Sequence, residues 1–134
     1  MSDEIVFYRL NAKVLERAED IPESSKQVVY YSLAIGHHIG VFDCFRPMLG
    51  CSRELWSRLL GALPQGEARR KLEGLERFGE ITVDRTHTHL LAPALAGIRE
   101  DLGDDARAWI DQFSEALAAI DAEPAIYLMG RRLR

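Results

Sequence analysis

The side chains best suited to catalysis or metal binding gather in one apolar stretch, where the adjacent histidines His37 and His38 are followed by Cys44 and Cys51. Imidazole and thiolate groups are ligands that zinc and other transition metals prefer. Neighbouring residues of a helix point about 100° apart, however, so the two histidines cannot reach one metal ion from the same face. Zinc sites also favour cysteines two to four residues apart, a closer spacing than this pair has. We therefore expect no metal and no cofactor, and a site built from these four residues is the alternative.

The remaining polar residues form no known catalytic motif. The chain contains no phosphate-binding loop, dinucleotide fingerprint, nucleophile elbow or metalloprotease helix. His87 and His89 would share one face of a strand, but they lie in a stretch that favours a solvated loop. His37 and His38 are then either hydrogen-bonded structural residues or contacts for a partner. The sequence thus predicts a protein that is not an enzyme.

A row of small residues suits the close approach of another backbone. Ser32, Gly36 and Gly40 recur every four residues, which places them on one face of a helix. Such a row accepts either a neighbouring helix of the protein's own core or a segment of a partner. Both interpretations are open from the sequence.

Compact clusters of arginine also suit a protein interface, because the planar guanidinium group is weakly hydrated and enriched there. By contrast, residues 100–123 carry eight acidic residues and one basic residue, Arg107, so we expect an acidic face on the last long helix. A solvated surface is the alternative for each of these charged groups. The candidate partner-binding arginines are Arg69, Arg70, Arg131 and Arg132.

Length, composition and charge restrict the class of protein. The chain has 134 residues, of which 47% are hydrophobic and 28% are charged, and we expect one domain spanning residues 1–134. A net charge of −4 argues against a nucleic-acid partner, because phosphate contacts require a basic surface. No stretch has the ~18 consecutive apolar residues of a membrane span, and the chain does not start with a secretory signal. We expect a cytoplasmic protein with reduced cysteines and no membrane insertion.

Hydrophobic periodicity predicts the elements that position these residues. A largely buried helix is expected between Ser24, its N-cap, and Pro47, although the β-branched residues 28–35 leave a strand as the alternative there. Residues 86–103 predict a loop with one or two helical turns after Pro93. Further strands are predicted at 4–10, 80–84 and 125–134, and further helices at 54–63, 67–77 and from 104 to Pro124. The fold class is α+β: a single compact domain with a small, mainly antiparallel sheet of about three strands, covered by four or five helices.

The most distinctive stretch of the chain resembles a known family. The sequence from Gln27 to His38, with its continuation through Gly40 and Cys44, closely resembles the formate hydrogenlyase maturation protein family HycH, including the paralogue from a related hydrogenase operon. The likeness recurs at residues 67–71, 73–74, 79–81, 125–129 and 131–134, and at Cys51. These blocks are spread over most of the chain.

The resemblance implies an accessory factor that is absent from the finished complex. Such a protein would be a chaperone that binds the precursor of the large subunit of a nickel-iron hydrogenase, before a separate endopeptidase removes the C-terminal extension of that subunit. The family has no established catalytic residues to carry over. The alternative is a small metal-handling or redox protein that uses His37, His38, Cys44 and Cys51 in nickel or iron delivery. The sequence favours the chaperone, which needs a complementary surface and no converging set of ligands.

Overall fold

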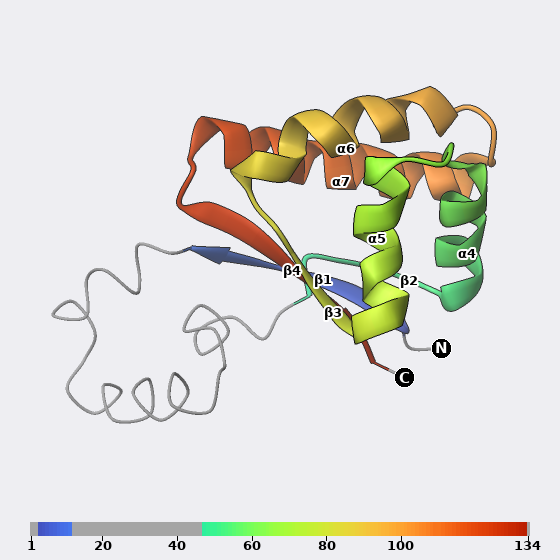
Figure 1. Cartoon of the computed structure of the whole chain (residues 1–134), viewed down its shortest axis with the longest axis horizontal. Coiled ribbons are helices and arrows are strands. Elements are labelled where there is room, and N and C mark those ends of the chain that lie inside the picture. Colours follow the sequence, from blue (N-terminus) through green and yellow to red (C-terminus); the bar gives the residue numbers. More distant parts are fainter. Residues whose placement is uncertain (1–2, 12–46, 134) are drawn as a thin grey trace, which may run out of the picture.

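The computed structural model describes residues 3–11 and 47–133 (Figure 1). The helix predicted from Ser24 onward therefore lies outside the described residues. Within them the fold is α+β, as predicted: helices pack on an antiparallel sheet of four strands.

The sheet is built around the first and last strands of the chain. β1 (Ile5–Asn11) pairs along its whole length with β4 (Ile126–Arg132), and β3 (Glu80–Val83) pairs with the other side of β4. These three strands confirm the strands predicted at residues 4–10, 80–84 and 125–134. A fourth, β2 (Leu49–Cys51), pairs with β1 and was not expected, because three residues are too few to show an alternating pattern. The strand order is β2-β1-β4-β3, with β2 and β3 at the edges.

Three of the helices begin and end close to where their sequence signals placed them. α4 (Arg53–Ala62) starts at the Ser52 side chain, which accepts a hydrogen bond from the backbone N–H of Leu55 at 3.1 Å. α5 (Glu67–Phe78) ends at Gly79, whose φ of 81° is the left-handed conformation that terminates helices. α7 (Asp104–Ala122) buries one stripe of apolar residues at helical spacing, among them Trp109, Phe113 and Leu117.

The loop predicted at residues 86–103 is wrong, because most of that stretch forms α6 (Arg85–Ile98). Asp84 caps the helix: its carboxylate accepts from the N–H of Thr86 at 2.9 Å, while Nδ1 of His87 accepts from the N–H of Asp84 at 3.1 Å. The helix is held against α7 by its buried side chains at helical spacing, Leu91, Leu95 and Ile98. Pro93 lies inside α6 on its exposed side, where water can satisfy the carbonyl that proline leaves without a partner.

The core between the helices and the sheet centres on aromatic rings. The centre of the Phe7 ring, on β1, lies 5.8 Å from that of Trp56 and 5.1 Å from that of Phe113. Trp109 stacks on Phe113 with 4.9 Å between the ring centres. Gly130, which pairs with Phe7 across the sheet, leaves room for the Phe7 ring, since a Cβ at residue 130 would lie 2.5 Å from it. These contacts tie β1, α4 and α7 into one core.

The second face of the sheet is also apolar. Val6, Leu10 and Met129 are at most 3% exposed, and Tyr8 and Tyr127 pack against Leu10 and Met129. Alternate residues of a strand point to opposite faces, so β1 contributes apolar side chains to both. This explains why polar and apolar residues do not alternate along most of β1.

Candidate partner-binding surface

Six of the residues singled out from the sequence lie outside the described residues: Ser32, Gly36, His37, His38, Gly40 and Cys44. Their proposed roles stay predictions. Among residues 3–11 and 47–133, no group of three or more His, Cys, Asp or Glu side chains is placed to hold a metal ion.

Cys51 is a free thiol, 4% exposed, at the end of β2. Burial, aided by the negative charge of Asp3, raises the pKa of this thiol to about 12. The group is therefore protonated at neutral pH, whereas a metal ligand or redox nucleophile must be a thiolate. Its environment suits packing rather than chemistry.

Arg69 and Arg70 are adjacent in α5 but have different surroundings. The side chain of Arg69 is 24% exposed and donates to the backbone carbonyl of Leu63 at 3.1 Å and to Glu73 at 3.3 Å, which fixes the turn between α4 and α5. The side chain of Arg70 is exposed and makes no ion pair within the described part of the chain. Of the two, Arg70 is the one available to a partner.

Arg131 and Arg132 point to opposite faces of the sheet, as the alternation of a strand requires. Arg131 pairs with Glu80 of the neighbouring strand at 3.1 Å. Arg132 reaches α5 on the helical side, where it donates to the backbone carbonyl of Glu76 at 2.8 Å and lies 3.4 Å from its carboxylate. Glu76 also accepts from Arg53 of α4 at 3.0 Å, so one carboxylate joins three elements.

Beside these arginines lies an exposed apolar surface that sequence reasoning missed. Phe78 is 77% exposed and Leu133 is 50% exposed, the large hydrophobic side chains that stand out in the described part of the chain. The guanidinium group of Arg77 lies 6.0 Å from the centre of the Phe78 ring. The backbone N–H of Arg132 bonds to the carbonyl of Gly79 at 3.0 Å, which places the end of β4 beside Phe78. We call Arg77, Phe78 and Arg132 the Phe78 patch.

A helical projection does not reveal this surface. The buried residues of α5 are Leu72, Gly74 and Leu75, and Phe78 follows Leu75 by three residues, which places it near the buried face. Its exposure reflects its position as the last residue of α5, where no further turn packs over it. Exposed aromatic residues next to arginine are the composition found at the centres of protein interfaces.

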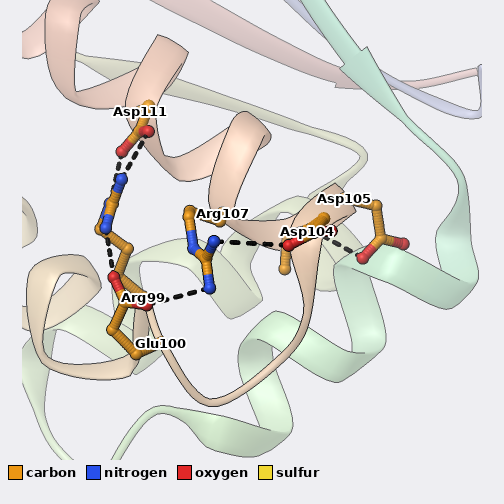
Figure 2. Close-up of polar contacts among 7 residues, drawn as sticks. Arg99, Glu100, Asp104, Asp105, Arg107 and Asp111 are labelled. Carbon is orange, nitrogen blue, oxygen red and sulfur yellow. Dashed lines mark hydrogen bonds and ion pairs between the residues drawn. The ribbon is translucent and has the colours of Figure 1, made fainter.

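The acidic run at residues 100–123 is partly neutralised in the structure. In Figure 2, Arg99 lies between Asp111 and Glu100, and Arg107 lies between Glu100 and Asp104. The Arg99 guanidinium is bidentate to Asp111, with N to O distances of 2.6 and 2.9 Å. This network fastens the turn between α6 and α7 and leaves less free negative charge than the count of residues indicates.

Arg58 of α4 adds to this fastening. It donates to Asp105 at 2.5 Å and to the backbone carbonyl of Leu102 at 3.1 Å. The ion pair holds the pKa of Asp105 below its usual range. The acidic residues at the start of α7 are thus structural, and the Phe78 patch is the better candidate for partner contact.

Comparison with known proteins places these features in one family. Residues 4–132 match the family model of "Formate hydrogenlyase maturation protein HycH". The chain is 43% identical over 130 residues to "Hydrogenase-4 component J" of Escherichia coli (strain K12), covering 97% of this chain and 95% of that protein. It is 42% identical over 135 residues to "Formate hydrogenlyase maturation protein HycH" of the same strain, covering 100% of this chain and 99% of that protein. No solved structure matches the chain. Within the described ranges, no helix combines the length and apolarity needed to cross a bilayer.

Proposed function

Because the chain belongs to the formate hydrogenlyase maturation protein family HycH, we propose that it is an assembly chaperone for the large, catalytic subunit of a formate hydrogenlyase-type nickel-iron hydrogenase. It binds the unprocessed precursor of that subunit and keeps it competent until a separate endopeptidase removes the C-terminal extension. It carries out no cleavage itself. The observation that carries the proposal is the match of nearly the whole chain to proteins named for hydrogenase maturation.

The Phe78 patch supports a binding role. The Phe78 side chain is 77% exposed, and its apolar surface is removed from water only when another molecule covers it. Covering Phe78 would contribute hydrophobic free energy, and the adjacent Arg77 and Arg132 can pair with client carboxylates. A chaperone needs such a surface and no reactive group.

The metal-handling alternative receives less support. Cys51, one of its four candidate ligands, has a thiol whose pKa is raised to about 12 by burial. A carrier of nickel or iron requires a deprotonated ligand that can meet the metal. The other three candidates, His37, His38 and Cys44, lie outside the described residues.

Co-purification tests the chaperone directly. Tagged large-subunit precursor and tagged processed subunit are each mixed with the purified protein, and retention of the protein is measured. We expect retention on the precursor in marked preference to the processed form, with the C-terminal extension intact after incubation. Phe78→Ala should weaken retention about tenfold or more without changing thermal stability, because the ring is mostly exposed. Equal retention on both forms, or loss of the extension without the endopeptidase, would contradict the proposal.

A further inference from the structure

A groove lies between α7 and β2, the strand at the edge of the sheet opposite β3. Its larger cavity has a volume of about 390 Å³ and reaches from Asp3 to Gln112, with Leu49 and Trp109 among its lining residues. A second cavity of about 210 Å³ shares Met48, Leu49 and Gln112 with the first and extends it along α7. The two cavities together form one elongated depression, which we call the β2 groove.

The outer side of β2, which forms one wall of the groove, pairs with no other strand in the described part of the chain. β2 is the terminal strand of the sheet and pairs only with β1 among the strands that the structure describes. The outer side of an edge strand presents N–H and C=O groups that can pair with an added strand. Because β2 has three residues, such pairing would extend over about 10 Å. Side-chain contacts in the groove must therefore supply the rest of the affinity.

Trp109 adds apolar surface to the groove. This residue lines the larger cavity, is 3% exposed, and stacks on Phe113 with 4.9 Å between ring centroids. Its indole Nε1–H is itself buried, so the ring offers the groove an apolar contact and no hydrogen-bond donor.

The charge of the groove selects the chemistry of its occupant. Three carboxylates lie along it, those of Asp3, Asp105 and Glu115, against one cation, Arg9. Asp105 is already paired with Arg58, whereas Asp3 and Glu115 make no ion pair within the described residues. Among the described residues that line the groove, the net charge is therefore acidic. The apolar contacts come from Met48, Leu49, Leu55 and Trp109.

We propose that the β2 groove binds an extended segment of the client protein that carries an apolar side chain flanked by lysine or arginine. The segment adds to β2 as a short antiparallel or parallel strand, its apolar side chain enters the larger cavity, and its basic side chain meets Asp3 or Glu115. This inference rests on the proposed function, since it assigns the client a second contact, distinct from the Phe78 patch.

A matched pair of substitutions on α7 tests the groove in the full-length protein. Ala108 lines the larger cavity and is exposed, so Ala108→Trp fills the groove without disturbing the core. Ala118, also exposed on α7, lines neither cavity, which makes Ala118→Trp the control. We expect Ala108→Trp to weaken retention on tagged precursor at least tenfold and Ala118→Trp to leave it unchanged, with equal thermal stabilities. If the unaltered protein binds precursor and Ala108→Trp binds equally well, the groove is not a client site, while the chaperone function stands. Failure of the unaltered protein to bind precursor would overturn both.

Synthetic peptides test the chemistry of the occupant. Overlapping peptides that cover the precursor sequence are labelled and titrated with the protein, with fluorescence anisotropy as the readout. Binding peptides should contain an apolar residue beside lysine or arginine, and Glu115→Lys should weaken their binding about tenfold or more. N-methylation of alternate peptide residues should abolish binding in one register and spare it in the other, because only one set of N–H groups faces β2. Preference for acidic peptides, indifference to N-methylation, or a photo-crosslinker at residue 112 that captures only this same chain would each overturn the proposal.

Discussion

Nη1 of Arg132 lies 2.8 Å from the backbone carbonyl oxygen of Glu76, and this hydrogen bond fastens the end of β4 to the last turn of α5. The sequence predicts Arg132 as a residue that contacts a partner. The structure gives its side chain a structural contact as well, next to the Phe78 patch. Removal of the Arg132 side chain should therefore lower the stability of the fold and weaken binding of the client.

Arg132→Ala should lower the free energy of unfolding by about 1 kcal/mol, because it removes a hydrogen bond and a partly exposed ion pair with Glu76. Urea denaturation measures the change. Arg131→Ala is the control, since the pairing of Arg131 within the described residues is with Glu80, on the other face of the sheet, and its loss should cost less. Equal losses in the two variants would show that the contact with the Glu76 carbonyl contributes nothing.

Arg70→Ala should weaken binding of the large-subunit precursor by roughly tenfold, or about 1.4 kcal/mol, and leave thermal stability unchanged. The reason is that the Arg70 side chain is exposed and makes no ion pair in the part of the chain that the structure describes. Arg85, exposed at the start of α6 and likewise without an ion pair there, is the matched control. Binding by titration calorimetry that is equal for Arg70→Ala and Arg85→Ala would exclude Arg70 from the client surface.

Stability should fall as the pH drops below about 6.5, the ordinary pKa of imidazole. Burial, together with the positive charge of Lys71, lowers the pKa of His87, although Asp84 opposes this. The unfolded chain therefore takes up a proton before the folded protein does, and stability is lost until the pH reaches the lowered pKa of His87. The neutral ring is also the form that can accept the hydrogen bond from the N–H of Asp84.

His87→Gln removes this titration while keeping a side chain that can complete the capping box of α6. Thermal unfolding between pH 5 and 8 should consequently show a shallower pH dependence for the variant than for the unaltered protein. Because the remaining histidines are the same in both proteins, the difference isolates His87. Parallel profiles would mean that His87 has the same pKa in the folded and unfolded states.

Gly130→Ala should destabilise the protein by about 1–3 kcal/mol, since the new methyl group would lie 2.5 Å from a carbon of the Phe7 ring. Gly61 of α4 has no atom within 4 Å of its would-be Cβ, so Gly61→Ala should stabilise by up to about 1 kcal/mol. Chemical denaturation of the two variants tests the comparison. A neutral Gly130→Ala would show that the sheet yields easily around Phe7.

Cys51 should react with a thiol reagent far more slowly in the folded protein than in denaturant, because its thiol is buried and has a pKa raised to about 12. The measurement uses Cys44→Ser, in which Cys51 is the single cysteine. Rapid reaction at neutral pH under native conditions would revive the possibility of a reactive or metal-binding thiol.

The sequence by itself determined the family and the elements with strong local signals. α4 and α5 were predictable because Ser52 caps one helix and Gly79 ends the other, and these signals act within a few residues. The approximate ends of β1 and β4 were predictable from the composition of these segments. The sequence also predicted that Arg131 and Arg132, at the end of β4, face opposite sides of the sheet, because side chains alternate along a strand.

Tertiary structure alone decided what depends on distant partners. α6 became a helix because Leu91, Leu95 and Ile98 pack against α7, a contact that local propensity around Pro93 does not reveal. β2 forms because Leu49–Cys51 pair with the edge of β1, and this pairing creates one wall of the groove. The ends of α5 and β4 meet only in the folded sheet, and this meeting leaves Phe78 exposed beside Arg132. Pairings between residues more than fifty positions apart depend on the packed core as a whole, which no short window of sequence contains.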